Sequence, residues 1–260
     1  PPPAIPLRLV GSEMCIRDRP WDFNNPAKRL KAVELLKRDE PDLIMVGPIC
    51  NPFCSLNLGW NFDKMPVGKV DHSIADGMRH LTFAVHLCML QVKAGRYFAF
   101  EHPVGAASWQ TRVMRMLARL QGCKQVEFDF CAYGMRSEDE LGSGLVKKRT
   151  RLLTNAGRVA EEGEKAQCRG GHRHVRLVSG RAGPCQEYPV ECCRAVCRGL
   201  AKQLDDDDPV IVTLNNILMI APKVEGGGKQ YDQMTVKDEI AKEEDEISLQ
   251  DEEDKPLTQD

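Results

Sequence analysis

Cys50 is the strongest candidate for a reactive side chain in this chain of 260 residues. It lies in the segment GPICNPFC (residues 47–54), directly after the apolar run 43–46, whose composition is typical of a buried parallel strand. A thiol on a loop at the end of such a strand becomes a nucleophile when neighbouring groups lower its pKa. The alternative is that Cys50 is a small apolar residue that serves packing.

Glu101 is expected close to this loop. It directly follows a second apolar run, 97–100, which predicts the next strand of the sheet. Because adjacent parallel strands end at the same edge of a sheet, the carboxylate of Glu101 and the thiol of Cys50 are predicted to share that edge. A lone glutamate at a strand end is usually a solvated or capping residue. Cys50 and Glu101 together therefore indicate a functional site more strongly than either residue alone.

The Cys50 segment resembles the catalytic loop of the cytosine carbon-5 DNA methyltransferases, and more closely that of the divergent methyltransferase-like domains found in retroelement polyproteins. The loop of that family reads Pro-Pro-Cys-x-x-Phe-Ser. Pro48, Cys50 and Phe53 match this pattern, whereas Ile49 and Cys54 stand in place of the second proline and the serine.

Two further family motifs have counterparts along the chain. The Glu-Asn-Val motif is matched at Glu101 of the segment EHP (residues 101–103), and the divergent relatives are similar to Glu-His-Pro or Glu-Asn-Pro. A Tyr-Gly motif is matched at Tyr133, and the family's following arginines correspond to Arg149 and Arg151, although the accompanying glutamine is absent and the spacing is stretched. The resemblance covers about residues 20–200 and rests on the order and spacing of the motifs.

This resemblance implies the chemistry of a DNA (cytosine-5)-methyltransferase. The thiolate, here Cys50, adds to carbon 6 of a flipped cytosine while Glu101 holds ring nitrogen 3, and carbon 5 takes the methyl group of S-adenosylmethionine. Arg149 or Arg151 would contact a loop or a phosphate. The implied partner is nucleic acid, in the first place DNA.

The part of the family fold that binds S-adenosylmethionine is expected to be missing. In the family a glycine-rich loop upstream of the catalytic cysteine cradles the cofactor, and no Gly-x-Gly element precedes Cys50. Residues 9–19 (LVGSEMCIRDR) resemble a translated sequencing-library adapter, so residues 1–19 are interpreted as a foreign leader. We therefore expect an N-terminally truncated domain that binds the cofactor poorly or not at all and is inactive as given.

A second group of residues has the composition of a zinc site. Cys168, His172 and His174 supply three donors within seven residues, which suits a tetrahedral zinc site if one more cysteine folds back. Cys131 and Cys185 are the candidates for the fourth ligand, and Cys131 completes the predicted set. The alternative is that these donors lie on a basic loop that faces nucleic acid.

Positive charge is concentrated before the C-terminal region. The 59 residues from Lys202 onward carry 17 acidic and 6 basic side chains, which leaves 30 basic and 21 acidic side chains in residues 1–201. Residues 147–198 hold twelve Lys or Arg and five Glu, a balance that favours a salt-sensitive attraction to phosphates. The predicted contacts are Lys147, Lys148, Arg149 and Arg151. The alternative is a solvated basic surface.

Helical and strand-like segments alternate along the chain. Helices and strands are predicted in turn over 27–38, 43–46, 73–93, 97–100, 107–120 and 125–130, with a possible helix N-cap at Ser73. This order predicts an α/β fold with a Rossmann-like, mostly parallel sheet. The glycine-rich segment 137–144 is predicted to be a loop, and a last helix is predicted over 189–203.

These patterns divide the chain into four parts. Residues 20–204 are predicted to form the truncated methyltransferase-like domain, which includes the basic Cys/His segment 147–200. Residues 205–222 form a boundary with a short apolar element, and residues 223–260 are predicted to be a disordered acidic tail. No membrane span or signal peptide is predicted, so we expect an intracellular, nuclear or cytoplasmic protein with reduced cysteines.

Two functional hypotheses follow from the sequence. The first is the catalytic half of a DNA cytosine methyltransferase-like domain from a mobile element, separated from its cofactor site. The second is a non-catalytic, zinc-stabilised nucleic-acid-binding module of a mobile-element protein.

Overall fold

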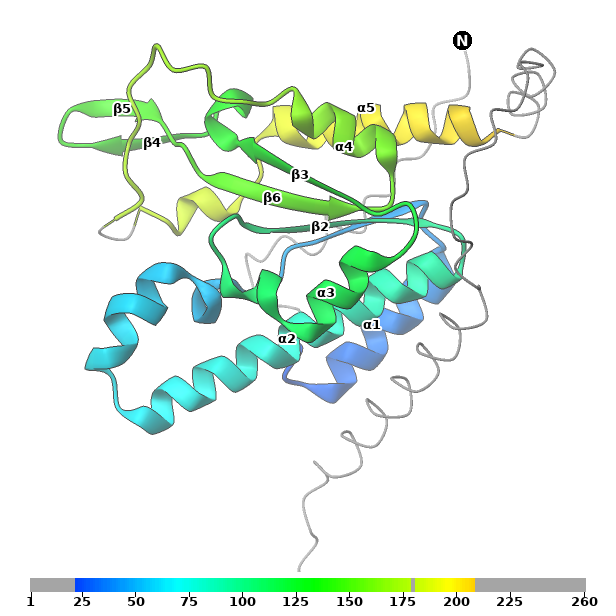
Figure 1. Ribbon diagram of the computed structural model, residues 1–260, viewed down its shortest axis with the longest axis horizontal. Helices are drawn as coiled ribbons and strands as arrows, with labels where there is room; N and C mark the ends of the chain where they lie inside the picture. Colours follow the sequence, from blue (N-terminus) through cyan, green and yellow to red (C-terminus); the bar gives the residue numbers. More distant parts are fainter. Residues whose placement is uncertain (1–21, 179–180, 209–260) are drawn as a thin grey trace, which may run out of the picture. The chain divides into compact units, whose positions relative to one another are not determined.

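A mixed four-stranded sheet forms the centre of the protein (Figure 1). The computed structural model describes residues 22–178 and 181–208, so the predicted leader 1–19, the apolar run 210–220 and the acidic tail 223–260 lie outside the described residues. The strand order is β1-β2-β6-β3. These strands are β1 (Leu43–Val46), β2 (Tyr97–Pro103), β6 (Arg149–Thr154) and β3 (Lys124–Asp129).

The prediction of a mostly parallel sheet is wrong, although the α/β class is confirmed. Strands β1 and β2 pair in parallel, but β6 lies between β2 and β3 and is antiparallel to both. The chain enters β6 from a two-stranded hairpin formed by β4 (Arg136–Asp139) and β5 (Gly142–Leu145). This hairpin, which was expected to be a loop, reverses the direction of the chain, so β6 runs back between its neighbours.

Helices cover both faces of the sheet, and the predicted alternation of helix and strand up to β3 is confirmed. Figure 1 shows α1, α2 and α3 on one face and α4 and α5 on the other. The helices are α1 (Pro26–Asp39), α2 (Val67–Lys93), α3 (Arg112–Arg119), α4 (Gly157–Glu164) and α5 (Val190–Asp207). None of the described helices is both long enough and apolar enough to cross a bilayer.

Short helical turns complete the described chain. They are η1 (Asn51–Phe53), η2 (Asn57–Asn61), η3 (Phe62–Lys64), η4 (Ala107–Gln110), η5 (Phe130–Tyr133) and η6 (Pro184–Gln186). The predicted cap at Ser73 is wrong, because α2 begins two turns earlier, directly after Pro66. The first turns of α2 are mostly exposed and carry no apolar stripe, which is why periodicity did not reveal them.

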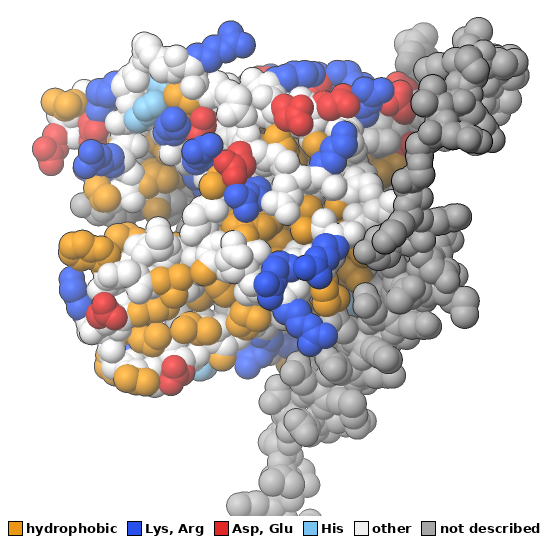
Figure 2. Space-filling view, viewed as in Figure 1, with side chains coloured by type: hydrophobic (Ala, Val, Ile, Leu, Met, Phe, Trp, Pro, Cys, Tyr) orange, Lys and Arg blue, Asp and Glu red, His pale blue; other side chains and the backbone are white. Residues whose placement is uncertain are grey.

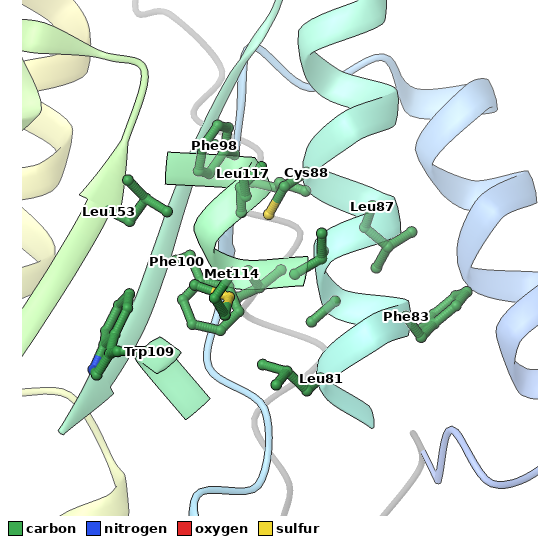
Figure 3. Packing of buried hydrophobic residues seen from close by; sticks show 14 of the residues in the cluster. Leu81, Phe83, Leu87, Cys88, Phe98, Phe100, Trp109, Met114, Leu117 and Leu153 are labelled. Atoms are coloured by element: carbon green, nitrogen blue, oxygen red, sulfur yellow. The ribbon is translucent and has the colours of Figure 1, made fainter. Parts of the chain in front are cut away.

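Side chains of β2 alternate between two hydrophobic clusters. Phe98 and Phe100 are fully buried against Leu81 and Cys88 of α2 and Leu117 of α3, as Figure 3 shows. Ala99 points to the opposite face, where α4 and α5 pack. This alternation also directs the two polar residues that follow, since Glu101 belongs to the face of Ala99 and His102 to the face of Phe100.

Candidate metal centre and the Cys50 loop

Four metal-binding side chains converge beside the end of β3. Cys131, Cys168, His172 and His174 each offer one donor atom, and all four donors lie within 4.8 Å of one another. Cys131 is on the short helix η5, while the other three come from the loop after α4. The structure thus brings together the four residues that the sequence analysis selected.

Two glycines make the turn that folds the histidines back onto Cys168. Gly170 and Gly171 have φ angles of 75° and 74°, a left-handed conformation that costs little only for glycine. Nε2 of His172 and of His174 consequently lie 3.6 and 3.5 Å from Sγ of Cys168. The segment with the spacing Cys-x3-His-x-His therefore folds back on itself and brings its three donor atoms together.

The donor loop is anchored on both sides. Nη1 of Arg173 donates hydrogen bonds of 2.7 Å to both carboxylate oxygens of Asp139 on β4, and these bonds are the main reason why the pKa of Asp139 is lowered. At the start of the loop, the backbone N–H of Cys168 donates to Oδ2 of Asp129 at 3.0 Å. Oδ1 of Asp129 is buried and has no partner among the described residues.

The donor set and its distances fit zinc. In a tetrahedral site with bonds of about 2.3 Å to sulfur and about 2.05 Å to nitrogen, sulfur and nitrogen ligands are about 3.6 Å apart. Both separations of Cys168 from the histidine nitrogens agree with this value, whereas the two nitrogens lie 2.9 Å apart, closer than the separation of about 3.3 Å in a tetrahedral site. Burial and the neighbouring Cys168 raise the pKa of Cys131 to about 11, so binding a metal would release a proton from this thiol.

Cys185, the other candidate for the fourth ligand, lies outside the cluster. Its buried thiol is 4.0 Å from the carbonyl oxygen of Arg136 on β4. Cys192 lies on α5 and packs in the core. None of the described cysteines forms a disulfide.

Cys50 and Glu101 lie at the same edge of the sheet. Cys50 directly precedes η1, four residues after β1, and Glu101 lies near the end of the neighbouring parallel strand β2. The pKa of the Cys50 thiol is raised, first by burial and next by the negative charge of Glu101, whereas Lys148 lowers it. This environment keeps the thiol protonated, which is the opposite of what an activated nucleophile needs.

The Glu101 carboxylate is enclosed by residues far away in the sequence. The Tyr188 hydroxyl donates a hydrogen bond of 3.0 Å to Oε2, and Nζ of Lys148 lies 3.8 Å from Oε1. Oε1 is buried and accepts no hydrogen bond among the described residues. Gly47 permits this arrangement, because a Cβ atom there would lie 2.7 Å from the Tyr188 hydroxyl.

His102 connects β2 to the Cys50 loop. Its Nε2 lies 3.1 Å from the carbonyl oxygen of Pro48, and its Nδ1 lies 2.6 Å from Oγ of Ser108. Burial lowers the pKa of His102, which favours a neutral ring that donates to Pro48 and accepts from the serine. On the other side of the loop, Gly77 of α2 leaves room for Pro52, whose Cγ would lie 2.7 Å from a Cβ at position 77.

The four residues predicted to contact nucleic acid lie in different environments. Arg149 and Arg151 project from β6 to the same partner, Glu127, with ion-pair distances of 3.1 and 2.6 Å. Lys148 faces Glu101 and the ring of Phe130. Lys147 is the fourth predicted contact. It is exposed, and among the described residues it is the only one of the four that forms no ion pair.

The described segment before Cys50 does not form a glycine-rich cradle for S-adenosylmethionine. Between residue 22 and Cys50 the chain has one glycine, Gly47, and its open side faces Tyr188 and Glu101. Glycine-rich loops bind cofactors because bare backbone N–H groups approach the ligand, and this segment offers no such loop. The cofactor predicted from the resemblance therefore does not fit these residues.

Sequence reasoning missed three residues that define these sites. Tyr188 and Asp129 reach the sites through tertiary contacts alone, and Lys148 was assigned to phosphate rather than to Glu101. Only Asp129 had a usable signal, because an acidic residue within a predicted strand needs a partner when it is buried. Comparisons with protein-family models, curated proteins and solved structures found no match to this chain.

Proposed function

We propose that this chain is a non-catalytic, zinc-stabilised module that binds nucleic acid. The observation that carries the proposal is the convergence of Cys131, Cys168, His172 and His174 on one point. Four protein donors close the coordination sphere of zinc, so the metal would be structural and would leave no open position for a substrate. Its role is to fix the donor loop to η5, while the hydrogen bonds from Arg173 to Asp139 hold the same loop to the β4–β5 hairpin.

The nucleic-acid part of the proposal rests on charge. Residues 1–201 carry nine more basic than acidic side chains, and Lys147 is exposed. A metal-fixed loop beside exposed basic residues gives phosphates a rigid binding surface, so less conformational entropy is lost on binding.

Elemental analysis of the purified full chain tests the metal. We expect one zinc per chain in the wild type and loss of zinc in Cys131→Ala and Cys168→Ala. Cys185→Ala is the matched control, because its thiol is buried nearby but lies outside the cluster, and it should keep the metal. A wild-type chain that binds no zinc after refolding with excess metal would overturn the zinc-stabilised reading.

Binding is tested by fluorescence anisotropy with a labelled DNA duplex across a range of salt concentrations. We expect binding that weakens steeply with salt, because released counterions supply the free energy. Removing zinc with a chelator should weaken binding at constant salt. No measurable binding at low salt would contradict the proposal.

A second candidate function is the one implied by the methyltransferase resemblance, a fragment of a DNA (cytosine-5)-methyltransferase-like domain that retains the base site. The observation that favours it is the buried Oε1 of Glu101, which accepts no hydrogen bond among the described residues and lies on the same sheet edge as Cys50. A carboxylate in this state suits the ring edge of a pyrimidine. In this reading Cys50 is the nucleophile of the complete enzyme, and S-adenosylmethionine is bound by a part that the described residues do not supply.

A trapping experiment separates the two functions. A duplex that contains 5-fluorocytosine is incubated with S-adenosylmethionine and a full-length parent protein that carries a cofactor-binding part, and covalent adducts are sought on denaturing gels. An adduct lost in Cys50→Ala and retained in Cys54→Ala would support the second candidate. DNA binding without an adduct, unchanged by Cys50→Ala, favours the non-catalytic module.

A further inference from the structure

Asp129 is a buried carboxylate beside the metal cluster. It is only 5% exposed and ends β3, shortly before Cys131 on η5. Its backbone N–H donates to the carbonyl oxygen of Ala166 at 2.9 Å, and its Oδ2 accepts from the backbone N–H of Cys168 at 3.0 Å. Both contacts are made to the start of the donor loop, so they hold the carboxylate next to the first cysteine of that loop.

The second oxygen of this carboxylate lacks a hydrogen-bond donor. Oδ1 of Asp129 is buried and accepts no hydrogen bond among the described residues. Arg149 is opposite Asp129 in the sheet register, but its guanidinium lies 3.1 Å from Glu127 instead. A buried carboxylate oxygen without a donor is unfavourable. The position of Oδ1 therefore indicates a donor that the neighbouring metal site supplies when it is occupied.

The two histidines of the cluster differ in their access to water. Nε2 of His172 and of His174 lie 3.6 and 3.5 Å from Sγ of Cys168, and a metal bound at Nε2 leaves the ring proton on Nδ1. Figure 2 shows histidine at the surface beside the β4–β5 hairpin, among Lys and Arg side chains. His172 is exposed, so water can accept its Nδ1–H, whereas the half-buried His174 needs an acceptor from the protein.

Asp129 is close enough to His174 to be this acceptor. Burial lowers the pKa of His174, and the negative charge of Asp129 opposes this shift. Zinc would separate the two histidine nitrogens from 2.9 Å to about 3.3 Å, so at least one ring has to shift when the metal binds. A carboxylate that receives the ring N–H fixes a metal-binding histidine in its new orientation.

We propose that Asp129 is a positioning residue of the metal site: Oδ2 holds the backbone of Cys168, and Oδ1 accepts the Nδ1–H of His174 when Nε2 of that ring binds zinc. This inference rests on the zinc-binding part of the proposed function. The hydrogen bond selects the correct tautomer of the ring and makes Nε2 a better ligand. One carboxylate then connects two of the four ligands.

Asp129→Asn tests the role of Oδ1 separately from that of Oδ2. Asparagine keeps one oxygen for the N–H of Cys168 but replaces the other by an NH2 group, which cannot accept a hydrogen bond. Titration of the full chain with zinc against a competing chelator should show an affinity reduced about 10–100-fold. If Asp129 only held the backbone of Cys168, the affinity would not change. Glu138→Gln, which alters an exposed carboxylate on β4, is the control and should keep the wild-type affinity.

A second set of variants identifies the histidine that Asp129 holds. His174→Cys retains four zinc ligands but has no ring N–H, so adding Asp129→Asn to it should lower the zinc affinity by less than about twofold. In the His172→Cys background the same addition should still lower the affinity about 10–100-fold. Equal losses in the two backgrounds would overturn the assignment to His174.

Urea unfolding of the metal-free chain separates positioning from a general role in folding. Asp129→Asn should be at least as stable as the wild type without metal, because a buried amide costs less than a buried carboxylate that lacks a donor. A clearly less stable metal-free variant would overturn the inference. If the wild type binds zinc and Asp129→Asn binds it equally well, the inference fails while the proposed function stands. If the wild type binds no zinc, both fail.

Discussion

The hydroxyl of Tyr188 donates a hydrogen bond of 3.0 Å to the carboxylate of Glu101 across 87 positions of sequence. This contact connects the segment before α5 to the edge of the sheet where Cys50 lies. Burial and the adjacent carboxylate raise the pKa of Tyr188 well above its usual value, so the hydroxyl remains a donor at any pH that the fold tolerates. The contact therefore closes the base site of the second candidate function from one side.

Tyr188→Phe should destabilise the protein by about 1–3 kcal/mol, because Oε2 of Glu101 would lose its donor while Oε1 already has none. Denaturant unfolding followed by circular dichroism measures the change. Gly47→Ala should cost a similar amount in the wild type, since its Cβ would meet the hydroxyl at 2.7 Å.

The two substitutions should be coupled. In the Tyr188→Phe background the Gly47→Ala change should cost less than in the wild type, because the atom that its Cβ would meet first is gone. Additive free energies of unfolding would contradict this account of the Gly47 position.

The reactivity of Cys50 should depend on its charged neighbours in opposite directions. Glu101→Gln removes a negative charge that raises the pKa of the thiol, so alkylation of Cys50 should become faster near neutral pH. Lys148→Met removes a positive charge that lowers the same pKa, so alkylation should become slower. Peptide mass spectrometry after timed iodoacetamide treatment measures both rates, with the rate at Cys197 on α5 as the internal reference. Equal rates at Cys50 in the two variants would contradict this electrostatic picture.

The turn at Gly170 and Gly171 should control metal uptake. Alanine at either position must adopt a φ angle near 75°, at a cost of about 1 kcal/mol, which corresponds to a zinc affinity reduced about fivefold. Competition with a zinc-sensitive dye measures the affinity. Gly105→Ala is the control, because a Cβ at position 105 meets no atom within 4 Å and its backbone needs no left-handed conformation. Wild-type affinity in both turn variants would show that the turn does not organise the donors.

The sequence was sufficient where short-range patterns decide the structure. Strand β1 has the predicted bounds because its residues are apolar on both faces and Gly47-Pro48 ends the run. The strand β6 was missed because Arg149 and Arg151 interrupt its apolar residues. Glu127 on the neighbouring strand compensates both arginines, and this pairing exists only after the sheet has formed.

The metal cluster was likewise predicted only as far as short-range patterns reach. The spacing of Cys168, His172 and His174 identified three donors, because a compact turn must bring them together. Spacing alone did not decide whether Cys131 or Cys185 is the fourth ligand. The structure places Cys131 at the cluster because the backbone N–H of Asp129 donates to the carbonyl of Ala166 at 2.9 Å, which draws the end of β3 to the donor loop.

Glu162 should make the pairing of α4 with α5 sensitive to acid. Its buried carboxylate accepts hydrogen bonds from Lys165 at 2.5 Å and Lys202 at 2.7 Å, and Arg198 lies 3.4 Å away. The two lysines are the main reason why the pKa of Glu162 is lowered to about 2. Because the folded pKa lies below the unfolded value, the stabilisation is present above about pH 5 and is lost as the pH falls toward 2.

Glu162→Gln should therefore lower the free energy of unfolding by about 1–3 kcal/mol at pH 7, a range reduced because the three cations are more than half exposed. The difference from the wild type should shrink at pH 4 and be smallest near pH 3, as measured by urea unfolding at each pH. Glu164→Gln, an exposed glutamate on the same helix, should change stability by less than about 0.5 kcal/mol at every pH. If the wild type and Glu162→Gln differ by the same amount at pH 7 and pH 3, the carboxylate charge does not stabilise the pairing, and shape alone holds α4 against α5.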